Sequence, residues 1–411
     1  MKIRFSKIEQ LISQLCPNGV EYKELDQIIV SLKTGLNPRK NFQLNTPDAQ
    51  HYYVTVRELN GIDIKFYDKT DRVNDEGLKL INNRSNLEAG DILFSGTGTV
   101  GRTALVRENP KDWNVKEGVY IIKPIKTVID SLFLLYYLNS SQARAEYSKK
   151  IVGSPVISVP MTDLKKIKIP VPPLAIQEEI VKILNSFTEL EAELEAELEA
   201  RKKQYEYYRE GLLTDGKDAI SVEINNIANY SKTRIAANEL NVDSYVGVDN
   251  LLQNRRGKTI SSYVPKSGKL TRYEVGDILV GNIRPYLKKI WLATNIGGTN
   301  GDVLVIRINE VENKNLSSKF LYHLLASDNF FSYNMQNAKG AKMPRGNKAA
   351  ILKYKIPLPN IENQNKIVAV LDKFDALVND ISIGLPAELN ARRQQYEYYR
   401  NKLLTFKEYV G

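Results

Sequence analysis

The chain has 411 residues, of which 42% are hydrophobic and 26% charged, as in ordinary globular proteins of two or three domains. One cysteine and two histidines exclude an internal disulfide and supply no zinc-type ligand set. The net charge of +10 is concentrated in residues 220–355, where 20 Lys and Arg face 10 Asp and Glu, and this excess favours an anionic partner.

The amino-terminal segment predicts a short helix. Ser6 and Glu9 have the spacing of a capping box, and Pro17 to Gly19 end the helix. We expect this helix to dock beside the carboxyl-terminal end of the chain. No signal-peptide core is present here and no apolar run approaches the roughly 20 residues of a membrane span, so we expect a cytoplasmic protein without membrane contact.

The chain is a tandem repeat of two halves. The segments 200–214 and 391–405 are identical at eleven of fifteen positions and share the sequence QYEYYR. Before each of them stands a second repeated block, 169–187 and 356–374, which begins IPxP and contains Gln177 or Gln364. A duplicated chain of this kind predicts pseudo-two-fold symmetry and suits a pair of matching partners.

Each repeat predicts a long helix after Pro170 and Pro357. Apolar residues recur at alternating spacings of three and four, which is the pattern of a coiled-coil seam, and each helix is expected to pair with the other. About 40 residues at 1.5 Å each give a rod of roughly 60 Å. The first rod contains the tetrad repeat LEAELEAELEA at 190–200, and Gly384 and Pro386 predict a break in the second.

The regions before the two rods share an outline but little sequence. Residues 90–106 and 276–293 each predict a strand, a turn and a second strand. A helix is predicted from Ser131 and from Ser318, and a glycine-led loop follows each helix at Gly153 and Gly340.

The motif GTGTVG at 96–101 permits two interpretations. It satisfies the glycine pattern of a dinucleotide site, and with Arg102 and Thr103 it nearly satisfies a phosphate loop. However, the following residues predict a strand where a dinucleotide site needs a helix, and Arg102 stands where a phosphate loop needs Lys. We therefore favour a hairpin turn.

Basic residues favour binding to nucleic acid, because Arg and Lys neutralise phosphates and Arg can also bind guanine in the major groove. Any single one of them is better explained as a solvated surface charge, whereas the clusters favour DNA as sets. The candidate DNA-binding residues are Arg39, Lys40, Arg57, Arg84, Arg102, Lys149 and Lys150 in the first half, and Arg234, Arg255, Arg256, Lys258, Arg284, Lys339, Lys342, Arg345 and Lys348 in the second.

The repeated order of variable region, IPxP block with a downstream Gln, long helix and QYEYYR segment resembles the specificity subunit of type I restriction-modification enzymes. The resemblance implies an α+β fold in which two α/β target recognition domains are separated by two long antiparallel helices forming a coiled coil with pseudo-two-fold symmetry. The domains expected are 1–168 (a short helix and the first recognition domain), 169–219 (the central long helix), 220–355 (the second recognition domain) and 356–411 (the carboxyl-terminal long helix).

The same resemblance implies a protein that is not itself an enzyme. Each recognition domain would read one half of a bipartite double-stranded DNA site, and the helices would hold two modification subunits, with restriction subunits joining them. S-adenosylmethionine, ATP and Mg would be used in those partner subunits, and no cofactor or metal is expected in this chain. The candidate partner-binding residues are Gln177, Gln364, Tyr205, Tyr208, Tyr396 and Tyr399.

Two other functions are weighed against this one. A non-enzymatic coiled-coil scaffold with protein-binding terminal domains would show no salt-dependent DNA binding. A nucleotide-dependent enzyme built on residues 96–101 would be stabilised by added nucleotide.

Overall fold

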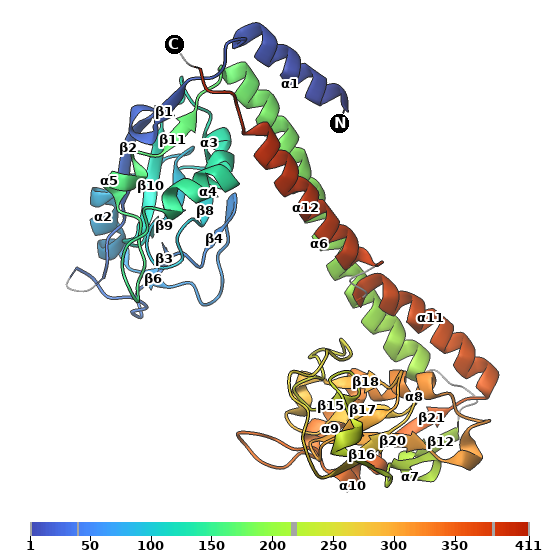
Figure 1. Cartoon of the computed structure of the whole chain (residues 1–411). Helices are drawn as coiled ribbons and strands as arrows, with labels where there is room; N and C mark the ends of the chain where they lie inside the picture. The colour runs from blue at the N-terminus through green and yellow to red at the C-terminus, as the bar shows by residue number, and fades with distance from the viewer. Residues whose placement is uncertain (1, 39–40, 215–219, 380–382, 410–411) are drawn as a thin grey trace. The chain divides into compact units, whose positions relative to one another are not determined.

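The computed structural model describes residues 2–38, 41–214, 220–379 and 383–409, so the candidate residues Arg39 and Lys40 lie outside the described residues. The chain divides into two compact units (Figure 1). Unit 1 comprises Met1–Glu193 with Asn390–Gly411, and unit 2 comprises Leu194–Leu389. The second segment of unit 1 is therefore far from the first in sequence.

The α/β domain of unit 1 is built on a four-stranded antiparallel sheet in the order β2-β10-β7-β8. These strands are β2 (Ile29–Thr34), β10 (Val119–Pro124), β7 (Ile92–Ser95) and β8 (Thr103–Leu105). The smaller sheets contain β6 (Arg72–Val73), β3 (His51–Val54) and β9 (Trp113–Val115), then β4 (Leu59–Asn60) with β5 (Asp63–Ile64), and β1 (Tyr22–Glu24) with β11 (Lys168–Pro170). The helices of this domain are η1 (Leu25–Gln27), α2 (Asp75–Arg84), α3 (Ser131–Leu138), α4 (Ser141–Ser148) and α5 (Met161–Leu164).

Unit 2 repeats this sheet as β13-β20-β17-β18, again antiparallel. These strands are β13 (Ala228–Tyr230), β20 (Val303–Ile308), β17 (Ile278–Gly281) and β18 (Ile290–Leu292). The other strands are β14 (Arg234–Ala236), β16 (Lys269–Tyr273), β19 (Gly297–Thr299) and β15 (Tyr245–Val246) in one sheet, and β12 (Ile220–Glu223) with β21 (Lys355–Leu358). The helices are α7 (Ile224–Ile227), η2 (Ala237–Glu239), η3 (Pro285–Leu287), η4 (Glu310–Glu312), α8 (Ser318–Leu325), α9 (Asp328–Gln336) and α10 (Lys348–Leu352).

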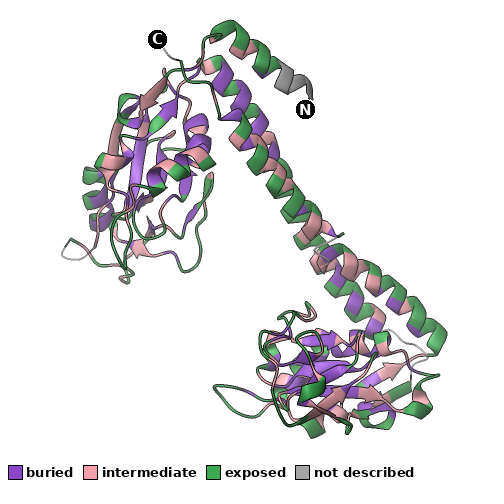
Figure 2. Cartoon of the chain, in the orientation of Figure 1, coloured by how far each residue is buried: buried purple, intermediate pink, exposed green. Residues whose placement is uncertain are grey.

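The predicted strand, turn and strand are confirmed in both domains. All four residues of β7 and of β17 are buried, because each strand lies between two others and against helices of its own domain (Figure 2). The motif at 96–101 joins the antiparallel strands β7 and β8, so the hairpin turn is the correct interpretation. The helices predicted from Ser131 and Ser318 are α3 and α8.

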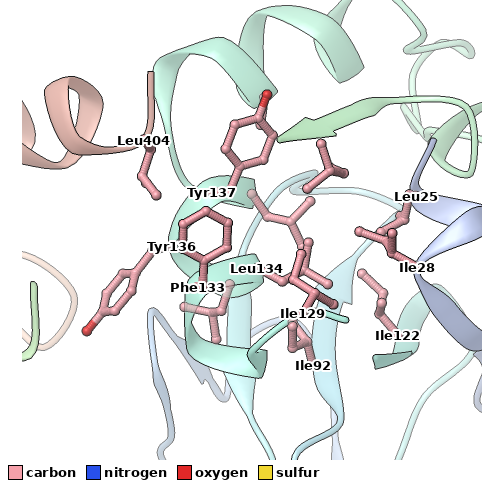
Figure 3. Packing of buried hydrophobic residues seen from close by; sticks show 14 of the residues in the cluster. Leu25, Ile28, Ile92, Ile122, Ile129, Phe133, Leu134, Tyr136, Tyr137 and Leu404 are labelled. Carbon is pink, nitrogen blue, oxygen red and sulfur yellow. The ribbon is translucent and has the colours of Figure 1, made fainter. Parts of the chain in front are cut away.

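The core of unit 1 gathers residues from distant parts of the chain. The side chains of Ile92, Phe133 and Leu134 are fully buried together, and Leu404 joins them with no exposed surface. Figure 3 shows Leu404 beside the aromatic side chains of α3, including Tyr137. The residues that follow the second QYEYYR segment are thus part of the core of the first domain.

The long helices confirm the predicted coiled coil. α6 runs unbroken over Leu174–Thr214, whereas its partner is divided into α11 (Ile361–Asn379) and α12 (Leu385–Leu403). Ile383 and Gly384 are not helical, as Gly384 and Pro386 predicted. Within unit 1, Phe187 of α6 stacks on Tyr399 of α12, with ring centroids 5.6 Å apart.

Within unit 2 the C-terminal half of α6 makes the corresponding contact. Tyr208 stacks on Phe374 of α11, with ring centroids 5.7 Å apart. Since later residues of α6 contact earlier residues of its partner helix, the pairing is antiparallel. The α+β class with two α/β domains and antiparallel long helices is therefore confirmed.

The amino-terminal helix differs in part from its prediction. α1 spans Lys2–Leu15, so it begins before Ser6 and the predicted cap at that residue is wrong. Its expected position beside the carboxyl-terminal segment is confirmed by the residues that follow it. The Val20 N–H donates to the Lys407 carbonyl at 2.8 Å, and the Tyr409 N–H donates to the Val20 carbonyl at 2.9 Å.

Candidate nucleic-acid interface

Two loops pair at one edge of the α/β domain of unit 1. The Gly98 N–H donates to the Ile157 carbonyl at 2.8 Å, and the Val159 N–H donates to the Gly96 carbonyl at 2.9 Å. A Cβ at Gly96 would lie 2.1 Å from the ring of Tyr120, so only glycine allows this close packing. Residues 96–101 and 152–159 are called the first loop edge.

The second domain pairs the equivalent loops by the same two bonds. The Arg284 N–H donates to the Pro344 carbonyl at 2.7 Å, and the Gly346 N–H donates to the Asn282 carbonyl at 3.0 Å. Each of these four residues lies 186 or 187 positions after its counterpart in the first loop edge. Residues 282–289 and 339–346 are called the second loop edge. The backbone scaffold is repeated although the side chains are not.

The two loop edges expose different chemistry. The first presents Val152, Val156 and Ile157, whose exposed fractions are 52%, 62% and 38%. The second presents Arg284, Tyr286, Lys342, Met343 and Arg345, all exposed. Basic and aromatic side chains on a protruding edge can contact phosphates and base edges, whereas an apolar edge can contact thymine methyl groups.

A cavity of about 730 Å³ borders the first loop edge, and Thr97, Gly98 and Val156 line it together with Arg57 and Lys116. Arg57 and Arg102 also share a neighbouring cavity of about 570 Å³. The sequence placed these two arginines 45 residues apart, and the structure brings them together. The Arg57 guanidinium is held by Asp71 at 2.8 Å but remains about half exposed.

Arg255 lies outside both loop edges, and its side chain is largely buried. Its side chain is only 12% exposed and donates to Asp328 at 2.7 Å and to the Ala326 carbonyl at 3.2 Å. Partial burial alone would raise the pKa of Asp328, but the hydrogen bond from Lys288 and the charge of Arg255 lower it. The charge of Arg255 is thus already neutralised within the domain, and its contact with DNA stays a prediction.

The rest of the predicted basic set is dispersed. Lys258 is half-buried, donates to the Asp243 carbonyl at 2.7 Å and lies 5.1 Å from the centre of the Trp291 ring, whereas Arg256 beside it is exposed. Lys339 and Arg345 pair through their backbones in the second loop edge. The remaining candidates also lie outside both loop edges: Arg84 at the end of α2, Lys149 and Lys150 after α4, Arg234 in β14 and Lys348 at the start of α10.

Gln177 and Gln364 are buried and fully bonded within the chain. The Gln177 amide accepts from the Asp130 N–H at 2.8 Å and donates to the carbonyls of Val128 and Pro172. Gln364 makes the same three bonds, in which it accepts from the Ser317 N–H at 2.9 Å and donates to the carbonyls of Asn315 and Pro359. With no exposed surface, neither amide can contact a partner, so each instead fixes a long helix to its own domain.

The predicted partner-binding tyrosines mainly pack the long helices. Tyr205 is 4% exposed, and its burial raises the pKa of its phenol. Tyr208 is 43% exposed and stacks on Phe374, while the half-buried Tyr396 and Tyr399 pack against Phe187. The prediction that Tyr205 contacts a partner is therefore corrected.

The predicted partner-binding residues did not include the two tyrosines that lie between Tyr205 and Tyr208 and between Tyr396 and Tyr399. Tyr207 is 76% exposed and Tyr398, its counterpart in the second repeat, is 61% exposed. Their signal in the sequence was identity at both repeats at a position one residue away from the apolar seam. They are the aromatic side chains that the repeated segments offer most openly to solvent.

Among the residues that the structure describes, no group of three or more His, Cys, Asp or Glu side chains is arranged to hold a metal ion. Within the same described ranges, no helix has the length and apolar character required to cross a membrane.

Comparison with known proteins identifies the family. Residues 17–200 and 216–391 each match the model of the type I restriction modification DNA specificity domain. The chain belongs to this family of DNA specificity subunits. The specificity subunit EcoR124I/EcoR124II of Escherichia coli is 32% identical over 333 residues, which cover 72% of this chain and 76% of that protein. The specificity subunit EcoprrI, also of Escherichia coli, is 30% identical over 316 residues, covering 71% and 72% of the two chains.

Solved structures support the fold of the specificity subunit. A chain from a study of complex assembly and conformational transition in a type I restriction-modification system aligns with a TM-score of 0.60 and 17% identity, covering 94% of this chain and 98% of that one. The S subunit from M. genitalium aligns with a TM-score of 0.52 and 15% identity, covering 94% and 96%. In this family the catalytic activities lie in other subunits, so the chain is not an enzyme.

Proposed function

We propose that this specificity subunit reads a bipartite double-stranded DNA site, one half-site with residues 1–168 and the other with residues 220–355. The observation that carries the proposal is the pair of loop edges, where the same two backbone hydrogen bonds support different exposed side chains. A repeated scaffold with divergent side chains suits two half-sites of different sequence.

The repeated helices are proposed to hold two modification subunits. Tyr207 and Tyr398 are exposed at equivalent positions, beside the equivalent stacks of Tyr208 on Phe374 and of Tyr399 on Phe187. Two equivalent surfaces suit two copies of one partner. The modification subunits would methylate adenine with S-adenosylmethionine, and restriction subunits would use ATP and Mg to translocate and cleave DNA in the cytoplasm.

The charge distribution adds an expectation about DNA affinity. Residues 220–355 carry a net charge of +10, whereas residues 20–168 hold 22 Lys and Arg against 18 Asp and Glu. Each neutralised phosphate releases counterions, so the second domain should contribute more of the non-specific affinity and of its salt dependence.

The test is co-expression of the chain with the modification subunit encoded in its own genome, followed by long-read detection of methylated adenine. A bipartite motif with a fixed unread spacer is the expected result. A stable complex that methylates no such motif contradicts the proposal. Failure to form any complex favours the coiled-coil scaffold instead.

A further inference from the structure

The second loop edge holds an arginine where the first holds a glycine. Gly98 and Arg284 make the same backbone bond to the facing loop, and both have left-handed φ angles, +78° and +51°. Glycine adopts this conformation without strain, whereas a residue with a long side chain is strained in it. A Cβ at Gly98 would meet no atom within 4 Å, so a side chain at this position projects into open space.

The Arg284 guanidinium does not take part in the contacts that hold the domain together. Its side chain is exposed, and the structure gives it no hydrogen bond or ion pair with any residue in the described ranges. Two other cations of the second loop edge are paired within the domain. Arg345 is paired with Asp302 at 3.1 Å, and Lys288 is paired with Asp328 at 2.7 Å. A strained backbone that presents an unpaired cation is a feature found at functional sites.

We propose that Arg284 reads a guanine in the half-site bound by the second recognition domain. This inference rests on the proposed function and adds the residue and the base. The planar guanidinium has two parallel donors that match O6 and N7 of guanine in the major groove. Tyr286 and Met343, each about half exposed on the same loop edge, supply apolar surface beside it. The first domain, with Gly98 here, must read its half-site by other contacts.

The experiment uses the full chain co-expressed with its modification subunit, with the methylated motif determined for the wild type, R284G and R284K. R284G relieves the backbone strain, so it should not lower the melting temperature. We expect R284G to relax one G·C position of one half-site by about 5- to 150-fold in discrimination, with the other half-site and the spacer unchanged. R284K keeps the positive charge but lacks the two parallel donors of the guanidinium, so it should also lower the discrimination at the same base pair.

N254G is the matched control, because Asn254 is also exposed and left-handed, with φ +57°, but carries no charge. It should leave the motif unchanged. Purified complexes are then titrated with duplexes carrying the motif or single base-pair substitutions. If R284G weakens all duplexes equally and R284K restores binding, Arg284 contacts a phosphate and the inference is overturned. An R284G motif identical to the wild type also overturns it, whereas a wild type that methylates no bipartite site refutes the proposed function itself.

Discussion

Replacement of Gln177 by Leu should loosen the first recognition domain from its long helix. The buried amide holds the Asp130 N–H at the start of α3 and the Pro172 carbonyl just before α6. Leu has a similar size and none of these bonds, so one N–H and two carbonyls would lose a partner. At about 1–3 kcal/mol for each buried group left unsatisfied, with the carbonyls partly relaxing, we expect a loss of about 2–5 kcal/mol.

The assay is calorimetry of the full chain combined with hydrogen exchange. For a unit of this size about 2–4 °C is lost per kcal/mol, so the transition of unit 1 should fall by roughly 4–20 °C. Exchange should rise at the start of α3 in Gln177→Leu and at the start of α8 in Gln364→Leu, because each amide serves only its own unit. Gln394→Leu, at an exposed position on α12, is the control. A melting temperature within about 1 °C of wild type, with unchanged exchange, would refute the reasoning.

Three further predictions concern the long helices. Asp372 of α11 accepts hydrogen bonds from His323 at 2.9 Å and from Lys319 at 2.6 Å, and these contacts lower its pKa to about 2. Its contribution to stability is therefore complete above its ordinary pKa and is lost as the pH falls toward 2, so the melting temperature of Asp372→Asn should vary less with pH between 2 and 5 than that of wild type. The equivalent pair in unit 1, Tyr136 with Asn185, has no carboxylate. Identical dependence of the melting temperature on pH in wild type and Asp372→Asn would contradict this account. Addition of one four-residue repeat within residues 190–200 lengthens α6 by about 6 Å and turns its end by about 40°. The unread spacer of the DNA site should therefore change by one or two base pairs, while both half-sites stay the same. Methylome sequencing that finds the original spacer would defeat this prediction. The double variant Tyr207→Ala, Tyr398→Ala should weaken co-purification of the modification subunit without lowering the melting temperature. By contrast, Tyr205→Ala should cost about 3–5 kcal/mol of stability. Equal co-purification of the double variant and wild type would exclude Tyr207 and Tyr398 from the interface.

The sequence predicted the features that arise from periodicity and duplication. The coiled-coil seam, the break near Gly384 and the hairpin at 96–101 all depend on neighbouring residues, so local patterns were sufficient. Repetition of the same blocks revealed two equivalent domains before any contact was known.

The sequence could not predict which polar side chains are used inside the fold. From the sequence alone Arg255 is expected to be an exposed surface cation. Its partner Asp328 lies 73 residues later in the chain, and only the fold brings the two together. Gln177 reads as an exposed helix residue because its three backbone partners come from two separate segments. In both cases the deciding interaction joins groups that only the tertiary fold brings together, whereas the strain at Arg284 depends on a φ angle that sequence alone does not give.

The position of Leu404 in the core of unit 1 has a consequence for synthesis of the protein on the ribosome. Unit 2 is one contiguous segment, so all of its residues have been translated before the second part of unit 1 begins. The apolar surface that Leu403 and Leu404 cover, next to Phe133, therefore stays open in the nascent chain until residue 404 emerges. The domain that is translated first is therefore the one whose folding is completed last.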